Sequence, residues 1–555
     1  MNKKSSQQKQ QHHQQLQAKK SANILSEITS FFFVIVTSIF PLFLTQTKYI
    51  QMTYQKSLFF WITTATAVFA VFCVFVFVKN SFSLKNYDID NEPKRPVSIS
   101  EWMILAFVIL TFASAVAASF NGVADVVWLG WPSRYEGFMS FLCYALTFLI
   151  IARFYKYKHW HLKIMAVSAI LVCLYGILQF LGIDIFELFP FTSINFKDYG
   201  PLSAHFRTTL GNINIVTAYC SFTVILFAAL FAASKSKSKL NIIYITASAA
   251  AFSMCLITGD GGDAGRVAIA AAMVLLIPYW ISDRERLGKI LIILSSWCAV
   301  YAAHDAYLSV LKNQCAENPA LFALKDRRIL ELFAPMNPLL LIISAAILLG
   351  AGLSLLLLLK KWAEKPLKTA GIIFLPVIFI VGILFVLLMG ENWADTPNNI
   401  IWQAREILHG RFGDRFGSGR GWIWKNAFAV LFDRPLLGSG PDTFYYSLGD
   451  RQIEAQAIFG EVYDKAHNVF LQTAVCMGIP AVLTYIAFIG SLFVSAVKKA
   501  FERPVLLAFG AAALSYMLQS FFCVEVPITT PLVWVAFGII AREIWLEKIG
   551  VCHNS

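Results

Sequence analysis

Four arginines and one histidine stand out because each lies next to an apolar run, in or beside a turn of small or polar residues. They are Arg134, Arg207, Arg266, Arg420 and His467. A guanidinium group offers a planar fork of donors that binds phosphate oxygens in pairs. A histidine beside such cations stays neutral and can accept a proton. A site that held all five would suit a phosphate or pyrophosphate group next to a general base.

The composition indicates which elements must position these residues. Of the 555 residues, 57% are hydrophobic and 14% are charged, whereas soluble domains have about 45–50% and about 25%. A soluble protein could not bury so much apolar surface. Because the backbone must satisfy its own hydrogen bonds in lipid, charge-free apolar runs predict membrane-spanning helices. The predicted fold is all-α: a polytopic integral membrane protein with about 14 transmembrane helices and one large outer loop that contains short helices.

Two of the apolar runs are unusual in length. The run 290–303 is short for a span, and the run 468–497 is long and contains Gly478-Ile479-Pro480, so a bend or break is predicted there. The complete set of predicted spans is 28–44, 57–78, 102–119, 137–152, 164–182, 213–233, 240–258, 267–282, 290–303, 337–359, 369–390, 468–497, 504–524 and 526–541.

The Lys and Arg residues of the loops predict the orientation. Short loops such as Lys235–Lys239 and Lys360-Lys361 fall on the cytoplasmic side when the N-terminus is placed there. Both termini are then cytoplasmic, and the four arginines and His467 lie on the outer face of the cytoplasmic membrane. Much of the net charge of +13 follows from this topology, so no nucleic-acid partner is expected.

The same topology divides the chain into five parts. We expect a disordered cytoplasmic tail at 1–23, transmembrane helices 1–11 at 24–390, a large extracytoplasmic loop at 391–467, transmembrane helices 12–14 at 468–546, and a second cytoplasmic tail at 547–555.

None of the predicted spans contains Asp, Glu, Lys or Arg, which disfavours an ion-coupled transporter. The sequence has no phosphate-binding glycine loop (Walker A motif) of the kind found in the nucleotide-binding subunit of a pump, no metal-ligand spacing and no pair of external cysteines.

The loop 391–467 is long enough to have a structure of its own. A short helix is predicted over Trp402–His409, and a second over Trp422–Phe432, with an apolar stripe of Trp424, Phe428 and Leu431. Arg420 precedes that second helix, where the helix dipole would add to its attraction for a phosphate. We interpret the loop as a lid over a site at the membrane surface, although a plain amphipathic surface helix would also explain Trp424 and Phe428.

These segments carry a family resemblance. The ordered set comprises Arg420-Gly-Trp-Ile-Trp, Pro435-Leu-Leu-Gly438-Ser-Gly440, His467-Asn468 and Met477-Gly478-Ile479-Pro480, with Arg134-Tyr-Glu-Gly137, Arg207…Gly211-Asn212-Ile-Asn214 and Thr258-Gly259 upstream. Together they resemble the O-antigen ligase / O-antigen polymerase family of bacterial membrane glycosyltransferases. The resemblance covers roughly residues 120–545, and the segment 400–480 is its specific part.

The resemblance implies a helical fold of the GT-C type and a transfer reaction at the outer face of the membrane. In this family a glycan passes from an undecaprenyl-pyrophosphate carrier to an acceptor hydroxyl, with inversion and without a metal or other cofactor. By position His467 resembles the catalytic histidine, and Arg207 and Arg266 resemble the arginines that bind the pyrophosphate. Arg134, Arg420 and Asn468 are the further substrate-binding candidates.

One segment departs from the family pattern. The family often has Ser-Arg-Gly directly after Thr-Gly, whereas here Asp260-Gly-Gly-Asp263-Ala-Gly265 intervenes before Arg266. Asp260 or Asp263 could therefore occupy part of the space of the substrate, which places the family role of Arg266 in question.

Three classes of function remain open at this point. The first is a ligase or polymerase of lipid-linked glycans, and the second is a lipid-linked oligosaccharide flippase or other non-catalytic carrier. The third, a multispanning peptidoglycan glycosyltransferase, would need a catalytic aspartate such as Asp414 or Asp464. The polar residues gather on one face only, which favours the first class.

Each residue taken alone also allows a purely structural interpretation. An arginine at a helix end often extends to the headgroups, and a lone histidine is often structural. The acceptor, the glycan and the choice between ligase and polymerase cannot be read from the residues.

Overall fold

The computed structural model describes residues 23–49, 51–77, 95–181, 183–188, 206–234, 240–258, 262–317, 338–357, 376–377, 379–388, 400–499 and 503–549. The predicted tail 1–23 lies outside these residues except for its last one. The end of the second tail, Asp260 and most of the predicted span 369–390 also lie outside them, apart from a helix at Phe379–Leu388.

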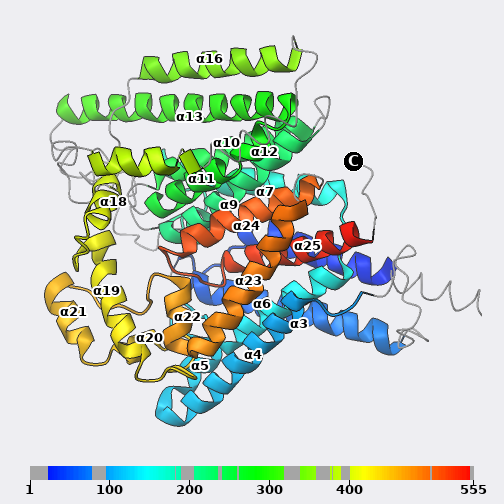
Figure 1. The fold of residues 1–555 in the computed structure, drawn as a ribbon, viewed down its shortest axis with the longest axis vertical. Coiled ribbons are helices and arrows are strands. Elements are labelled where there is room, and N and C mark those ends of the chain that lie inside the picture. The colour runs from blue at the N-terminus through cyan, green and yellow to red at the C-terminus, as the bar shows by residue number, and fades with distance from the viewer. Residues whose placement is uncertain are drawn as a thin grey trace, which may run out of the picture.

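The described chain is a bundle of apolar helices, which confirms the predicted all-α, polytopic class (Figure 1). Among the described residues, eight helices are long and apolar enough to cross a membrane, and four more apolar helices are shorter. The bundle helices are Asn23–Leu42, which contains η1 (Ile35–Ile39) and α2 (Phe40–Leu42), α3 (Met52–Phe77), α4 (Ile99–Ala118), η3 (Ser119–Val123), α5 (Ala124–Leu129), α6 (Phe138–Phe154), α7 (His159–Phe180), α9 (Ile213–Ala233), α10 (Leu240–Ile257), α11 (Asp263–Leu275), α12 (Ile277–Trp280), α13 (Arg284–Glu317), α16 (Pro338–Leu357), α22 (Val469–Met477), α23 (Ile479–Lys499), α24 (Pro504–Ser520) and α25 (Thr530–Lys548).

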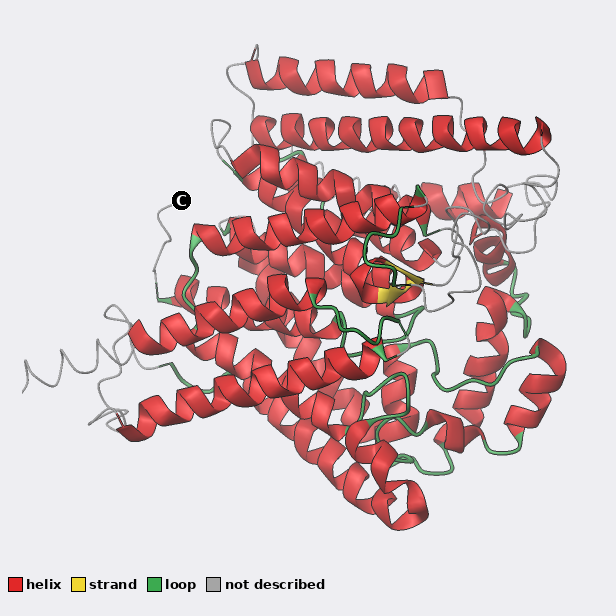
Figure 2. Cartoon of the chain, turned by 180° about the vertical axis from the view of Figure 1, so that it is seen from behind, coloured by secondary structure: helices red, strands yellow, loops and turns green. Residues whose placement is uncertain are grey.

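Four helices of the long loop gather at one end of the bundle, and the C-terminus lies at the other end (Figure 1). They are α18 (Ile400–Leu408), α19 (Phe416–Leu431), α20 (Phe444–Leu448) and α21 (Arg451–Phe459). A small antiparallel hairpin, β1 (Phe206–Arg207) and β2 (Gly211–Asn212) around η4 (Thr208–Leu210), lies toward the same end (Figure 2). The two helices predicted within the loop correspond to α18 and α19, so the short-helix prediction is confirmed.

Helix α9 is the centre of the bundle. It is apolar on all sides, and almost every side chain along it is buried, as expected of a helix enclosed by other helices. It packs against α10 on one side and α24 on another, while α25 packs against α6, and α23 against α4. The N-terminal end of α9 therefore holds the hairpin next to the segment that joins α24 to α25.

The structure corrects several span boundaries. The short run 290–303 belongs to α13, a helix of 34 residues. Charged residues also enter the helices: Lys56 in α3 and Asp305 in α13 are both buried. The Lys56 ammonium donates to the Phe40 and Pro41 carbonyls, at 2.9 and 3.2 Å, and so caps the end of the first helix. Both residues lie just outside the predicted spans 57–78 and 290–303, because a charge-free run ends near a charged residue although the helix continues past it.

The predicted break at Gly478 is confirmed, since α22 ends at Met477 and α23 begins at Ile479. Gly478 has φ +91°, and a Cβ atom there would lie 2.2 Å from the Leu436 carbonyl oxygen. The turn Pro435–Gly440, which we call the clasp, packs against this break. Its Gly440 amide donates to the Cys476 carbonyl at 2.7 Å, and the Ile479 amide donates to the Pro435 carbonyl at 2.8 Å.

The clasp thus gives the last carbonyls of α22 a partner and fixes the helix at its C-terminal end. These hydrogen bonds give the family-like Pro-Leu-Leu-Gly-Ser-Gly segment a structural role. It sets the position of α22, and the N-terminus of α22 carries the candidate site.

We expect Gly478→Ala to lower the free energy of unfolding by about 2 kcal/mol or more, because the new methyl group meets backbone at a positive φ. The matched control is Gly490→Ala in the interior of α23, where a Cβ atom would have nothing within 4 Å. Thermal unfolding of the full chain in detergent compares the two variants. Equal melting temperatures for both would contradict the clasp.

Candidate functional site

The candidate site centres on the segment that connects α21 to α22. His467 lies at its end with φ +50°, a left-handed conformation that costs a non-glycine residue about 1–3 kcal/mol. Asn468 is the N-cap of α22, and its Oδ1 accepts from the Phe470 and Leu471 amides at 3.0 and 2.9 Å. The cap begins the helix at a fixed residue, so it sets where the imidazole lies.

Side chains on both sides hold this segment in place. The Trp424 indole of α19 donates to the Ala466 carbonyl at 3.0 Å, and the Ala466 amide donates to the Gln472 side-chain oxygen at 2.7 Å. The amide group of Gln452 makes two bonds with the Tyr463 backbone, at 2.7 and 3.0 Å. The strained residue is therefore surrounded by contacts that determine its conformation.

The predicted apolar stripe on α19 is only partly correct. Phe428 is 57% exposed, whereas Trp422 and Ile423 are buried. The buried face is rotated from the predicted one, because α19 packs on α20 and α22. Trp424 serves the site through its hydrogen bond to Ala466 and not only through its apolar surface.

A buried ammonium group ties the segment to two other parts of the chain. Lys465 Nζ lies 2.6 Å from Glu136 Oε2 and 2.6 Å from Asp442 Oδ1. The other oxygen of Asp442 accepts from the Trp131 and Glu136 amides, at 2.7 and 3.1 Å. The 130–137 turn, the end of the clasp and the histidine segment thus meet at one cation.

One ammonium between two carboxylates neutralises only one of them. Burial, and then the charge of Asp442, raises the pKa of Glu136 to about 7, although the charge of Lys465 acts in the opposite direction. Burial alone would lower the pKa of Lys465, but Asp442 and Glu136 hold it above its usual value. The lysine therefore stays charged and cannot act as a base at neutral pH.

Arg134 is held by a second ion pair. Its Nε and Nη2 donate to the two oxygens of Asp464 at 2.8 and 3.1 Å. Burial would raise the pKa of Asp464, but the charge of Arg134 and these two bonds hold it below its usual range. A phosphate at Arg134 would have to compete with this carboxylate, and the pair ties Arg134 to the histidine segment.

The electrostatic surroundings keep His467 neutral. Burial, then the positive charges of Arg420 and Arg134, lower its pKa to about 3. Its Nδ1 is buried and makes no hydrogen bond with any residue that the structure describes. A neutral imidazole with a free nitrogen is in the correct state to receive a proton.

Arg420 lies at the start of the regular part of α19. Gly417, Ser418 and Gly419 all have positive φ, so the preceding turn is non-helical, as the Gly-rich sequence predicts. Arg420 donates through Nε to the Phe522 carbonyl at 2.7 Å and through Nη1 to the Gly417 carbonyl at 2.5 Å. These bonds fix the guanidinium plane between α19 and the 521–529 segment.

The other two arginines lie on neighbouring elements. Arg207 belongs to the β1–β2 hairpin, and its side chain lies outside the described residues. The hairpin leads into α9, where the Asn214 carbonyl accepts from Gln519 at 3.2 Å and the Cys523 thiol lies 3.9 Å from Asn214 Oδ1. This contact brings the hairpin end of α9 to the same 521–529 segment that binds Arg420.

Arg266 lies in the first turn of α11. Its guanidinium group is 3.1 Å from Asp263 Oδ1, so the aspartate of the inserted segment pairs with the arginine. A Cβ atom at the preceding Gly265 would lie 3.0 Å from Thr217 of α9. Arg266 is therefore one residue from a close contact with α9, and a phosphate would have to displace or share the Asp263 contact.

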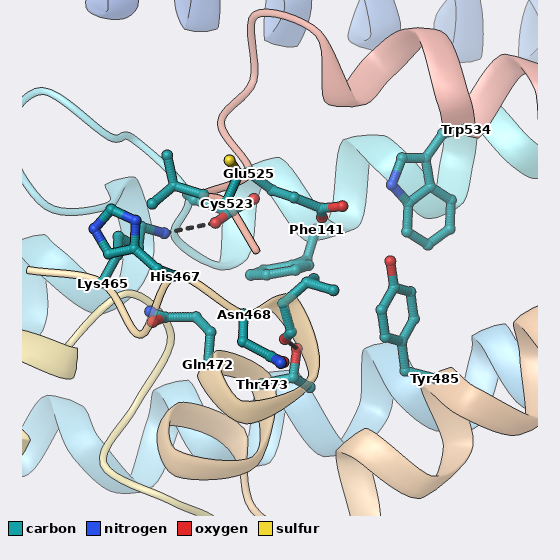
Figure 3. Close-up of a pocket in the computed structure, with 13 residues that line it drawn as sticks. Phe141, Lys465, His467, Asn468, Gln472, Thr473, Tyr485, Cys523, Glu525 and Trp534 are labelled. Atoms are coloured by element: carbon teal, nitrogen blue, oxygen red, sulfur yellow. Dashed lines mark hydrogen bonds and ion pairs between the residues drawn. The ribbon is translucent and has the colours of Figure 1, made fainter. Parts of the chain in front are cut away.

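A small cavity opens beside His467 (Figure 3). Its volume is about 20 Å³, enough for one water molecule or one hydroxyl group. Lys465 and His467 lie to one side, and Glu525 with the aromatic rings of Tyr485 and Trp534 to the other. The remaining lining residues are Glu136, Phe141, Asn468, Val469, Gln472, Thr473, Cys523 and Val524.

Four site residues were missed by the sequence reasoning: Glu136, Asp442, Lys465 and Glu525. Glu136 and Lys465 stand two residues from Arg134 and His467, and Asp442 follows the clasp, so proximity to the motifs was a usable signal. Glu525 separates two apolar runs, and a single charge there predicts only the boundary between two spans. It lies instead in the buried segment between α24 and α25.

We expect Lys465→Met to lower the free energy of unfolding by about 3–5 kcal/mol, because it leaves two buried carboxylates without a counter-charge. The control is Lys425→Met: its side chain is 74% exposed and 3.8 Å from Asp414, so the expected change is below about 0.5 kcal/mol. Thermal unfolding in detergent measures both. A stable Lys465→Met protein would show that the cation is dispensable to the fold.

A family model described as O-Antigen ligase matches residues 339–486, a segment that contains α19, the clasp and His467. The match confirms the resemblance inferred from the sequence and supports glycan transfer of the O-antigen ligase type by a multi-pass membrane protein. No curated protein matches the chain.

Proposed function

We propose that this chain, which carries an O-antigen ligase segment over residues 339–486, transfers a glycan from undecaprenyl pyrophosphate to an acceptor hydroxyl. The observation that supports this most directly is the environment of His467. A neutral imidazole with an unpartnered nitrogen borders a cavity of hydroxyl size, next to the cations Arg420 and Arg134. That arrangement combines a proton acceptor with positive charge for a leaving group.

In the proposed reaction the acceptor oxygen attacks the anomeric carbon while the bond from that carbon to the pyrophosphate breaks. His467 takes the hydroxyl proton as general base. The pyrophosphate departs with the bonding electrons, and Arg420, Arg207 and Arg266 stabilise its charge. A single displacement inverts the anomeric carbon and requires no covalent glycosyl–enzyme intermediate. A metal ion or other cofactor has no necessary role in this step.

The low pKa of His467 in the free protein fits this order of events. An imidazole with a pKa of about 3 is neutral but a weak base. Binding of the pyrophosphate brings negative charge next to Arg420 and Arg134, which offsets the charges that depress the pKa. The base therefore becomes stronger only when the donor is in place.

The location follows from the same proposal. The site lies at the outer face of the cytoplasmic membrane, both termini lie in the cytoplasm, and the bilayer holds the polyprenyl tail. The large loop 391–467 covers the site, and Asn468 lines the cavity beside His467. The acceptor is a lipid, a growing glycan, a protein or a wall polymer that carries a free hydroxyl group.

We expect His467→Ala, Arg207→Ala and Arg420→Ala to reduce transfer about 10²-fold or more while the protein still folds, because each removes a general base or a charge contact of the leaving group. The control is Arg411→Ala, whose side chain is 52% exposed and pairs with Glu406 on the loop surface. The assay returns each variant to a host strain that lacks the gene and measures long surface glycan.

The deletion strain separates the two forms of the reaction. Loss of long chains identifies a polymerase, and long chains that stay on the carrier identify a ligase. Normal glycan from both His467→Ala and Arg207→Ala would disprove the mechanism. Transport of the carrier without any new glycosidic bond would support the flippase alternative instead.

The pH dependence gives an independent check. His467 is neutral above its pKa of about 3, so kcat/KM should show no acid limb from this group between about pH 5 and 8. In the donor complex the pKa is raised, so kcat should fall at a higher pH than kcat/KM as the solution is acidified. Steady-state kinetics of the protein in nanodiscs would measure both; an acid limb at the same pH in both profiles would contradict the proposal.

A further inference from the structure

Glu525 is a buried carboxyl group that the proposed mechanism does not use. It lies between α24 and α25, is 6% exposed and lines the cavity beside His467. Its Oε1 has no hydrogen-bond partner among the residues that the structure describes. Unlike Glu136, it forms no ion pair within that part of the chain, although buried carboxylates are normally paired.

The unpartnered atoms at this cavity point to an occupant. Glu136 Oε1, His467 Nδ1, Glu525 Oε1 and Trp534 Nε1 are all buried without a hydrogen bond to a described residue, and all four residues line the same space. Buried polar atoms in folded proteins nearly always have a protein or water partner. A small polar group in the cavity would supply several of the missing partners at once.

The volume limits what that group can be. A space of about 20 Å³ accepts one water or one hydroxyl group and not a sugar ring. The aromatic wall does not offer a free stacking face either, because the Trp534 ring already stacks on Tyr144 and Phe488, with interplanar angles of 12° and 13°. A single hydroxyl that projects from a larger ligand fits this shape.

The groups around Glu525 favour its neutral form. Burial first, and then the charge of Glu136, raise its pKa to about 8, while the Ser520 hydroxyl and the Lys465 charge act in the opposite direction. The hydroxyl groups of Tyr144, Tyr485 and Tyr516 are the other titratable groups that interact with it, from α6, α23 and α24. Apart from Lys465, none of these groups is a cation that would stabilise the ionised form.

We propose that Glu525, as a neutral carboxylic acid, binds a hydroxyl group of the acceptor and positions the acceptor end next to His467. A protonated carboxyl group has one donor and free acceptor capacity, as does a hydroxyl group, so the two can form a reciprocal pair. This hydroxyl fills the cavity, so the hydroxyl that His467 deprotonates is a different one on the same acceptor and lies outside this space. This inference rests on the proposed glycan transfer, and it adds that the acceptor is recognised as a polyol rather than as an amine or an anion.

The test uses the full chain in nanodiscs with two extracts as probes. The donor is undecaprenyl-pyrophosphate glycan from the host, and the acceptor is the membrane fraction of a host strain that lacks the gene. We expect Glu525→Ala to raise the half-saturating amount of acceptor about 10-fold or more, with a smaller change in kcat. Glu525→Gln keeps a donor and an acceptor, so it should remain within about 3-fold of the unmodified protein at neutral pH.

The pH profile separates this positioning role from a purely structural one. In the unmodified protein the half-saturating amount of acceptor should rise as the pH passes about 8, because Glu525 then loses its donor proton. The Glu525→Gln variant should lack this rise. Melting temperatures of all variants control for folding.

Three results would overturn the inference. They are an unchanged acceptor requirement in Glu525→Ala, an equal loss in Glu525→Gln and Glu525→Ala, or a loss of kcat alone. The first would mean that the cavity holds only structural water, and the other two that Glu525 acts as an ionised base. If His467→Ala also transferred glycan normally, the proposed function itself would fail, which is a separate outcome.

Discussion

The site depends on one buried cation. Lys465 Nζ contacts Glu136 and Asp442 at 2.6 Å each, and all three side chains are almost fully buried. A buried ion pair contributes little net stability, but an unpaired buried charge is very costly, so the three segments cannot separate without a large penalty. The main effect of these buried ion pairs is therefore to fix the relative positions of the segments. It places the 130–137 turn, the clasp and the histidine segment around one point, and His467 is two residues from it.

Helix α22 is held in a similar way at both ends. Asn468 caps its first turn, and the Pro435–Gly440 clasp binds its last carbonyls. Between these two restraints the helix has little freedom to shift, and the left-handed conformation of His467 is maintained by its neighbours. Rigid support of this kind is what a proton transfer requires, because a general base must lie within hydrogen-bond reach of its substrate.

Much of the fold could be predicted from the sequence, because apolar runs of membrane length leave the backbone few alternatives to helix. The break at Gly478 was also predictable, since glycine there weakens a helix and the nearby proline interrupts it. The Lys465 cluster was not, because Glu136 lies more than 300 residues from both Asp442 and Lys465 in sequence, and only tertiary packing brings them together. Glu525 was missed for a related reason: a charge between two apolar runs marks a loop, but the sequence does not show that the loop is buried.

The two sides of the cavity have opposite electrostatic character, and this difference suits a transfer reaction. On one side Arg420, Arg134 and Lys465 supply positive charge, which lowers the pKa of His467. On the other side Glu525 lines the cavity together with the aromatic rings of Tyr485 and Trp534, and burial raises the pKa of its carboxyl group. In the proposed reaction an anionic leaving group would be stabilised near Arg420 and Arg134, and a neutral hydroxyl would be bound next to Glu525. Under this proposal the charged carrier would lie on the cationic side of the cavity and the uncharged acceptor next to Glu525.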